Sequence, residues 1–415
     1  MTYIQQLGFN AKNAEPYISS ASTTLKNSAL SAISKALREN IDLIISENAK
    51  DLANAVDNGM SASLQDRLKL DEKRIDAMAN GVDELIALSD PVGEILSGGM
   101  RPNGLQILKT RVPLGVIGII FESRPNVTVD AAALCLKAGN AVILKGGKEA
   151  INSNKCLSNI MQKAVESVGL PANIIQLVEN TSRESTTELM KLNDYLDVLI
   201  PRGGAGLIQA VVNQATVPVI ETGIGNCHVF VDADADLEMA VNIVVNGKTS
   251  RPSVCNAVES LLVHSDCCET FLPIIAKKLA EYNVKMYGCQ RTAAILGDCI
   301  EPATDAEYAK EFLDYAISIK VVSDINEAIS HIRRFGTKHS ECIVTSSLNS
   351  AKKFQNEVDA AAVYVNASTR FTDGGEFGLG AEIGISTQKL HTRGPMGLNE
   401  LTTIKYLING NGQIR

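Results

Sequence analysis

A single cysteine stands where covalent chemistry is expected. Residues 251–257 (RPSVCNA) place Cys255 between a proline-bearing turn and a predicted helix start. The reactive form of a thiol is the thiolate, and a helix N-terminus together with the neighbouring Arg251 would lower the pKa of this thiol. The chain has nine cysteines, and a cysteine in a protein is usually a small buried apolar side chain. Cys255 is therefore a candidate nucleophile, and the rest of the chain must decide between the two interpretations.

Several other polar residues follow predicted strands. Continuous apolar runs such as 116–121 and 141–144 predict strands buried on both faces, and the segments between them predict helices. Repeated strand–loop–helix units indicate a doubly wound parallel sheet, which binds ligands at the carboxyl ends of its strands. The residues just past a strand end are Asn126, Lys145, Gly203-Gly204 and Glu221. We expect all of them to face one crevice.

The glycine-rich turn at 203–206 (GGAG) has two interpretations. At a strand-to-helix turn, such a segment can hold a phosphate on backbone amides. The segment does not match the GxGxxG pattern, and close packing of the turn would explain the glycines as well. Lys145 also has two interpretations. It is either an ordinary exposed lysine or a lysine that contacts a ribose or a phosphate of a ligand.

The order of the elements predicts two α/β domains. The first hundred residues are predicted to be mostly helical, with amphipathic stretches at 22–56 and 64–88 that would cover a sheet. Residues 105–112 alternate like an edge strand or hairpin arm, and residues 401–408 alternate like a terminal strand. The boundary between the domains is predicted near Asn226, and the glycine-rich tail from Phe371 onward is predicted to return to the first domain.

Composition and spacing exclude several classes of function. A net charge of −8 and a pI near 5.3 argue against nucleic-acid binding, and the longest apolar runs are too short to span a membrane. The N-terminal residues lack the pattern of a signal peptide. The cysteines lack disulfide or zinc spacing, and two candidate ligands, His331 and His339, are eight residues apart. Reduced thiols in the cytoplasm and no metal are the simplest account.

Seven stretches together resemble a known family. They are FESRPN (121–126), AGNAVILKGG (138–147), IPRGGAG (200–206), VIETGIGNCH (219–228), RPSVCNA (251–257), HIRRFGTKHSECI (331–343) and FGLGAEIGISTQKLHTRGPMGLNELTT (377–403). The chain resembles, over nearly its whole length, the aldehyde dehydrogenase superfamily, and within it the family of glutamate-5-semialdehyde dehydrogenases, or gamma-glutamyl phosphate reductases. Two departures, Ser250 and the segment GTKHSEC, do not touch the expected chemistry.

The resemblance implies a fold and a division of the chain. The fold would have two doubly wound parallel-sheet domains plus a small β element for oligomerisation. Residues 1–225 would bind NADP, with 105–121 as a possible hairpin arm of that element, and residues 226–370 would carry the nucleophile. The tail, 371–415, would return to the first domain and end in an oligomerisation strand.

The resemblance also implies roles for individual residues. Cys255 matches the thiol nucleophile, and Asn126 matches the amide that stabilises the oxyanion together with the backbone N–H of Cys255. Glu221 matches the general base of hydrolytic aldehyde dehydrogenases, in which it precedes the cysteine by a similar distance. Because an acyl-phosphate reductase need not activate water, the role of Glu221 stays open.

The same resemblance implies a nicotinamide cofactor. Lys145 matches a ribose-contacting lysine, and Lys148 replaces the glutamate that is common in members that prefer NAD. A lysine at that position favours the 2′-phosphate of NADP. Gly203 and Gly204 match the cofactor-contacting turn, and Glu311 lies where the superfamily contacts the nicotinamide ribose.

The implied reaction is the NADPH-dependent reduction of L-glutamate 5-phosphate through a cysteine thioester, the second step of proline biosynthesis from glutamate. Arg251, Arg124 and Ser253 are candidates for holding the substrate or its phosphate, and a structural ion pair is the alternative for each arginine. Partners would be a small-molecule substrate, a second copy of the chain and, functionally, a glutamate 5-kinase. An oxidising aldehyde dehydrogenase, a silent scaffold and a cofactor-free thiol hydrolase are the alternatives.

Overall fold

The computed structural model describes residues 1–415, apart from the side chain of Ser63, and divides them into two compact units. The first unit contains residues 1–222, 378–384 and 396–415, and the second contains residues 223–377 and 385–395. The division falls at Gly223, three residues before Asn226. The expectation for the tail was too simple, because residues 371–377 and 385–395 belong to the second unit.

A parallel sheet forms the centre of the first unit. Its strands lie in the order β5-β4-β3-β6, with β3 (Val116–Phe121), β4 (Ala141–Lys145), β5 (Ile175–Leu177) and β6 (Val198–Arg202). A parallel bridge between Leu199 and Val219 continues the sheet beyond β6. Alternate residues of β3 enter two different cores, since Ile117 and Ile119 pack on one face and Val116 and Ile120 on the other. Burial on both faces explains why this strand is a continuous apolar run.

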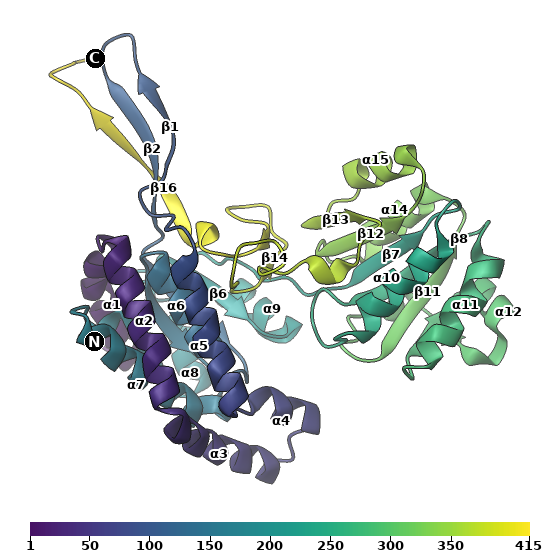
Figure 1. Ribbon diagram of the computed structural model, residues 1–415, viewed down its shortest axis with the longest axis horizontal. Coiled ribbons are helices and arrows are strands. Elements are labelled where there is room, and N and C mark those ends of the chain that lie inside the picture. The colour runs from purple at the N-terminus through teal and green to yellow at the C-terminus, as the bar shows by residue number, and fades with distance from the viewer. The chain divides into compact units, whose positions relative to one another are not determined.

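Helices cover both faces of this sheet (Figure 1). They are α1 (Tyr3–Ser19), α2 (Thr23–Glu39), α3 (Ile41–Asp57), α4 (Ala62–Leu68), α5 (Glu72–Ala87), α6 (Asn126–Lys137), α7 (Ile151–Ser167), α8 (Arg183–Leu189) and α9 (Ala205–Gln214).

The prediction of one helix over 22–56 was wrong, because the chain breaks at Asn40. This residue leaves the helical conformation with φ −117° and ψ 23°. Its side-chain amide donates a hydrogen bond to the carbonyl of Ala36 at 2.7 Å, an example of local competition with the backbone ladder. The stretch 64–88 is likewise divided, into α4 and α5.

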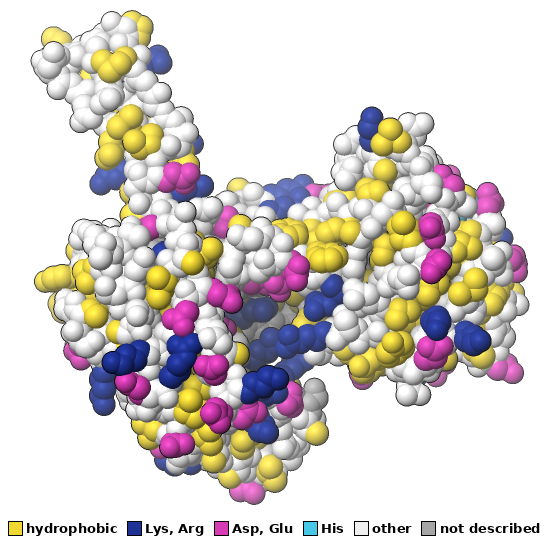
Figure 2. Space-filling view, in the orientation of Figure 1, with side chains coloured by type: hydrophobic (Ala, Val, Ile, Leu, Met, Phe, Trp, Pro, Cys, Tyr) yellow, Lys and Arg dark blue, Asp and Glu magenta, His cyan; other side chains and the backbone are white. Residues whose placement is uncertain are grey.

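Three antiparallel strands extend away from the helices of the first unit (Figure 1). They lie in the order β1-β2-β16, with β1 (Ile95–Met100), β2 (Gln106–Pro113) and β16 (Thr402–Asn409). The strands predicted at 105–112 and 401–408 are both present, and they pair with each other. Apolar side chains lie on the outside of this sheet (Figure 2), including Ile95, Met100, Tyr406 and Ile408. We call this sheet the arm.

The second unit is built on a seven-stranded parallel sheet. Its order is β10-β9-β11-β8-β7-β12-β13, with β7 (Cys227–Val231), β8 (Val258–His264), β9 (Lys285–Gly288), β10 (Glu301–Pro302), β11 (Ala316–Val322), β12 (Ser340–Val344) and β13 (Ala362–Val365). Its helices are α10 (Leu237–Thr249), α11 (Cys268–Ala280), α12 (Gln290–Leu296), α13 (Asp305–Tyr308), α14 (Ile325–Phe335) and α15 (Leu348–Glu357). A short antiparallel pair, β14 (Ile385–Ser386) and β15 (Gly394–Pro395), completes the unit.

Neither a membrane-spanning helix nor a metal-binding cluster is present among the described residues. None of their helices combines the length and the apolar character that a membrane span requires. No group of three or more His, Cys, Asp or Glu side chains among them is arranged to hold a metal ion.

Candidate active site

Cys255 lies in a turn between α10 and β8, and the predicted helix start at this residue was wrong. The strand β8 begins at Val258, which leaves no room for a helix after the cysteine. The preceding helix end is the C-terminal end of α10, whose dipole does not favour a thiolate. A helix N-terminus therefore does not stabilise the thiolate of Cys255.

The environment of Cys255 differs from that of most other cysteines. Six of the nine thiols are buried, and burial raises the pKa of Cys342 to about 12 and that of Cys267 to about 11. Cys255 and Cys289 are half-buried, and Cys299 is exposed. Although burial raises the pKa of Cys289, hydrogen bonds from Thr292 and neighbouring backbone groups lower it below its ordinary value. Cys289 is thus the thiol against which Cys255 must be tested.

The segment 223–227 packs directly on the back of the Cys255 turn. A Cβ at Gly225 would overlap the carbonyl group of Cys255 and lie 2.7 Å from its Cα. The thiol of Cys227 donates to the same carbonyl oxygen at 3.2 Å. The amide of Gly225 donates to Glu311 Oε1 at 2.6 Å. Only glycine fits at position 225, and this contact gives the stretch VIETGIGNCH a physical role beside the thiol.

Asn256 anchors the other side of the turn. Its side chain is buried, and its amide nitrogen donates to the carbonyls of Arg370 (3.2 Å) and Thr372 (2.9 Å). Its own carbonyl accepts from the hydroxyl of Thr369 at 2.7 Å. The residue after the nucleophile is therefore held by segment 369–372, which follows β13.

Arg370 contacts both ends of the turn and was missed in the sequence. Its Nε donates to the hydroxyl of Ser250 at 3.2 Å, and its Nη1 donates to Asn256 Oδ1. Burial and the positive charge of Arg251 lower the pKa of Arg370, while Asp373 and Cys255 act in the opposite direction.

In the first unit, Asn126 is the first residue of α6, which follows β3 after a short loop. Its side-chain Nδ2 donates to Asp130 Oδ2 at 2.9 Å. Burial raises the pKa of Asp130 to about 6, against the lowering effects of the Asn126 amide and of the charge on Arg202. An amide nitrogen carries two hydrogens, so Asp130 fixes the orientation of the amide and leaves one N–H for another acceptor. Asp130 is four residues beyond Asn126 on the same helix face, a spacing that the sequence offered but that was not used.

The other predicted residues of the first unit lie at the same edge of its sheet, because its strands are parallel. Lys145 ends β4 and is buried, with its Nζ donating to the carbonyl of Gly146 at 3.3 Å, and burial lowers its pKa. Lys148 is exposed just beyond it. Glu221 is half-buried and follows the segment that extends the sheet past β6.

The glycine turn after β6 is closely packed. A Cβ at Gly203 would lie 2.6 Å from the carboxyl carbon of Glu122 and 2.8 Å from Leu207, while the amide of Gly204 donates to Glu122 Oε2 at 3.0 Å. Packing therefore accounts for Gly203. The amide of Gly204 is engaged by Glu122, so a phosphate at the start of α9 would have to replace that contact. The two lysines at the same sheet edge suit the phosphates and hydroxyls of a dinucleotide.

The remaining candidates are divided between the units. Arg251 is exposed and Ser253 is half-buried, both in the Cys255 turn. Arg124 lies in the loop after β3, where its amide donates to the carbonyl of Glu122 at 2.7 Å. Burial raises the pKa of Glu311, which accepts the Gly225 hydrogen bond described above. The structure thus gathers one group at the sheet edge of the first unit and another around Cys255.

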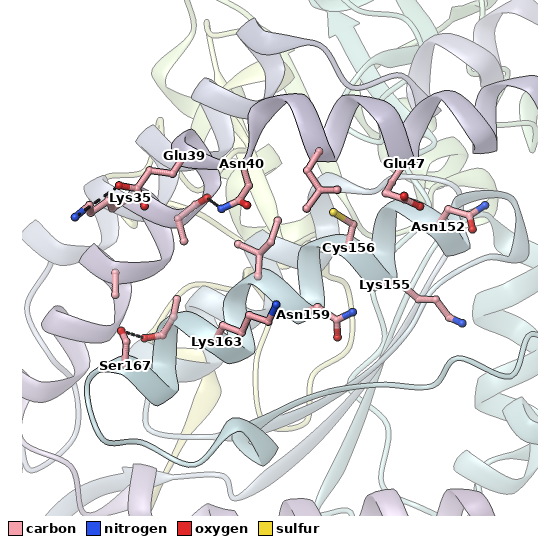
Figure 3. A pocket seen from close by; sticks show the side chains of 15 residues that line it. Lys35, Glu39, Asn40, Glu47, Asn152, Lys155, Cys156, Asn159, Lys163 and Ser167 are labelled. Carbon is pink, nitrogen blue, oxygen red and sulfur yellow. Dashed lines mark hydrogen bonds and ion pairs between the residues drawn. The ribbon is translucent and has the colours of Figure 1, made fainter.

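A separate pocket of about 640 Å³ lies among α2, α3 and α7 (Figure 3). Its labelled side chains include Lys35, Glu39, Glu47 and Cys156, and none of the predicted site residues lines it. Its charges are largely paired with each other or with neighbours, as for Lys35 with Glu39 at 3.6 Å. This pocket does not belong to the candidate site.

Comparisons with known proteins identify close relatives. The model of the aldehyde dehydrogenase family matches residues 5–310. A gamma-glutamyl phosphate reductase of Clostridium perfringens is 60% identical over 408 residues, which are 98% of each chain, and one of Clostridium novyi is 59% identical over 413 residues. The crystal structure of a gamma-glutamyl phosphate reductase from Thermotoga maritima has a TM-score of 0.97 and 47% identity, with full coverage of both chains. An acetylating aldehyde dehydrogenase from Geobacillus thermoglucosidasius shares the fold, with a TM-score of 0.73 and 17% identity.

Proposed function

Because the chain belongs to the aldehyde dehydrogenase family and, within it, to the gamma-glutamyl phosphate reductases, we propose that it reduces L-glutamate 5-phosphate to L-glutamate 5-semialdehyde and phosphate. This is the second step of proline biosynthesis from glutamate. The observation that carries the proposal is 60% identity over 98% of both chains, together with a half-buried Cys255 held in a shaped turn.

Cys255 is the nucleophile of this reaction. A free carboxylate is a poor acceptor of hydride, so the substrate arrives as an acyl phosphate. The thiolate attacks the carbonyl carbon, the carbon–oxygen bond to the phosphoryl group breaks, and inorganic phosphate departs with the bonding electrons. The product of this step is a thioester on Cys255. Reduction of the thioester gives a thiohemiacetal, which releases the semialdehyde and regenerates the thiol.

Asn126 and the backbone N–H of Cys255 supply hydrogen bonds to the oxyanion that forms during attack. One preorganised donor of this kind contributes about 3 kcal/mol to stabilising the transition state. The hydrogen bond from Asn126 to Asp130 supports this role, because it holds the amide in one orientation. Glu221 is a site residue whose basic function is not required, since the reductive direction needs no activated water.

The residues at the sheet edge of the first unit would hold a nicotinamide dinucleotide, which would supply the hydride. We assign NADP(H) on the basis of Lys148, whose exposed ammonium suits a 2′-phosphate. Lys145 and the amides of Gly203 and Gly204 would hold the ribose and phosphates. Glu311 would receive a ribose hydroxyl of the nicotinamide half. Arg251, Arg124 and Ser253 are the candidates for binding the substrate.

The reverse reaction tests the proposal. Purified protein is mixed with pyrroline-5-carboxylate, NADP and inorganic phosphate, and the absorbance of the reduced nicotinamide is followed. We expect NADPH formation that requires phosphate and is lost in Cys255→Ala. The matched controls Cys289→Ala and Cys299→Ala remove a lower-pKa thiol and an exposed thiol, respectively, and should keep activity.

Two outcomes contradict the proposal. Formation of NADPH without phosphate would mean that water resolves the thioester, which would make Glu221 a general base and the protein an oxidising dehydrogenase. Loss of activity in Cys289→Ala with activity retained in Cys255→Ala would move the nucleophile to the other thiol.

A second copy of the chain is the proposed partner of the arm. Members of the aldehyde dehydrogenase family commonly form oligomers, and the arm exposes Met100 (66%), Ile95 (59%) and Ile408 (59%). Apolar groups on a projecting sheet favour burial in an interface. Functional pairing with a glutamate 5-kinase, which would supply the acyl phosphate, is also proposed. Sedimentation of the protein with and without Ile408→Lys, a change that should favour the monomer, measures the role of the arm.

A further inference from the structure

Two arginines of the second unit gather on the turn that carries the nucleophile. Arg251 belongs to the turn itself, and Arg370 comes from segment 369–372. The guanidinium of Arg370 is fixed by hydrogen bonds to Ser250, the residue before Arg251, and to Asn256, the residue after Cys255. Arg370 therefore lies across the turn, with its charge beside the thiol.

This arrangement is electrostatically unfavourable without a further anion. The positive charge of Arg251 is close enough to lower the pKa of Arg370, and partial burial acts in the same direction. Among the described residues, no ion pair joins either guanidinium to a carboxylate. The negative charges that act on Arg370 are those of Asp373 and of the Cys255 thiolate, neither of which forms an ion pair with it. A structure that concentrates two like charges in this way is suited to a ligand of opposite charge.

We propose that Arg370 and Arg251 together bind the phosphoryl group of the acyl phosphate and the inorganic phosphate that leaves it. This inference rests on the proposed function and names the element that recognises its leaving group. Two guanidiniums match a dianion, and the planar fork of arginine matches phosphate oxygens. The phosphoryl group is bonded to the carbon that Cys255 attacks, whereas the α-carboxylate of the substrate lies at the far end of the carbon chain and carries a single charge.

The pair has a second consequence for the thiol. No helix N-terminus stabilises the thiolate, because α10 ends before the turn and no helix begins at Cys255, whereas the positive charge of Arg370 interacts favourably with it. When phosphate occupies the pair, its negative charge offsets theirs. Phosphate should therefore slow the reaction of Cys255 with an external electrophile, both by occupying space and by raising the pKa of the thiol.

Steady-state kinetics in the reverse direction test the pair. We expect Arg370→Gln to raise the KM for inorganic phosphate by about 10- to 100-fold, as for the loss of a charge-assisted contact, with a much smaller change in the KM for pyrroline-5-carboxylate. Arg370→Lys, which keeps the charge but not the fork, should recover part of the loss. Ser250→Ala removes one of the hydrogen bonds that fix Arg370 without altering charge, and it should raise the KM for phosphate by less than Arg370→Gln does. Arg291→Gln removes an exposed positive charge elsewhere in the unit and should stay near wild type.

Alkylation of the cofactor-free protein tests the anion site without catalysis. Iodoacetamide labelling of Cys255 is followed by peptide mass spectrometry with increasing inorganic phosphate, at ionic strength held constant with chloride. Phosphate should protect Cys255 in the wild type and in Arg291→Gln, and protection should be lost in Arg370→Gln and weakened in Arg251→Gln. Protection in a protein that shows no reverse activity would retain the anion site while rejecting the proposed reaction.

Several results would overturn the inference. A rise in the KM for pyrroline-5-carboxylate with an unchanged KM for phosphate would assign Arg370 to the α-carboxylate. A fall in kcat alone, matched by Ser250→Ala, would reduce Arg370 to a support for the turn. Equal protection by phosphate in the wild type and in Arg370→Gln would remove Arg370 from the phosphate site.

Discussion

Adding one methyl group at Gly225 should disable the nucleophile without removing any catalytic group. In Gly225→Ala the new Cβ would lie 2.7 Å from the Cα of Cys255 and would overlap its carbonyl group. Carbon atoms in contact normally lie about 3.5–4.0 Å apart, and the new Cβ would also lie 1.4 Å from the carbonyl oxygen of Cys255. The Cys255 turn or segment 223–227 must therefore move by at least roughly 1 Å. The obstruction is backbone, which cannot rotate away as a flexible side chain can.

The expected loss follows from that displacement. A misplacement of about 1 Å at a reacting group costs on the order of 100-fold in rate. We therefore expect the kcat/KM of the reverse reaction to fall by about 100-fold, which corresponds to ~2.7 kcal/mol of lost transition-state stabilisation. Overpacking of the same contact should lower the free energy of unfolding by about 1–3 kcal/mol. Alkylation of Cys255 should also change in rate, because the carbonyl contact with Cys227 is disturbed.

A matched control separates the clash from the substitution itself. Gly81 lies inside α5 and has open space where a Cβ would be. Gly81→Ala should therefore keep full activity and gain up to about 1 kcal/mol of stability from its better helix propensity. Wild-type kinetics and an unchanged alkylation rate in Gly225→Ala would refute the argument that this glycine positions the thiol.

Three other substitutions have defined outcomes. Lys148→Glu should raise the KM for NADP about 10-fold or more relative to that for NAD, because it replaces attraction for a 2′-phosphate with repulsion; equal effects on both cofactors would contradict this. Because burial raises the folded-state pKa of Asp130 to about 6, its ionised form destabilises the fold above that pH. Asp130→Asn should then stabilise the protein at pH 8 by up to about 3 kcal/mol and give no gain near pH 4, as measured by urea unfolding. Lys248→Met leaves Glu259 buried without its partner at 2.5 Å and should cost about 3–5 kcal/mol, while the added change Glu259→Leu should restore part of the loss.

The sequence predicted best the elements whose pattern is local. The strand β3 coincides with the apolar run 116–121, because a strand covered on both faces has no polar position. The helix break at Asn40 was not predictable, because it depends on a side chain that bonds back to Ala36 while apolar residues continue on either side. Hydrophobic periodicity reports which face is buried and does not report such a break.

In the candidate site, too, the residues within a local sequence motif were predicted, and those that depend on contacts distant in the sequence were not. Cys255 was proposed from its own motif, whereas Arg370 was not, because its contacts with Ser250 and Asn256 join residues more than 100 positions apart. The predicted helix start at Cys255 was wrong because the turn runs directly into β8. Asp130 was missed although it lies one helical turn from Asn126, since a carboxylate on an amphipathic helix is usually solvated.

The insertion of the second unit between parts of the first has a consequence for biosynthesis. The strand β2 pairs with β16, which lies about 290 residues later in the chain, and the whole second unit is translated in between. Until β16 has been synthesised, β2 can pair only with β1, and its other edge stays unpaired. This edge exposes apolar side chains and backbone hydrogen-bonding groups without partners. All strands of the second unit, β7 to β15, are translated before β16, so this unit can fold first. The nascent chain is thus most vulnerable to mispairing in the interval before β16 emerges, and chaperone binding should concentrate on the unfinished arm.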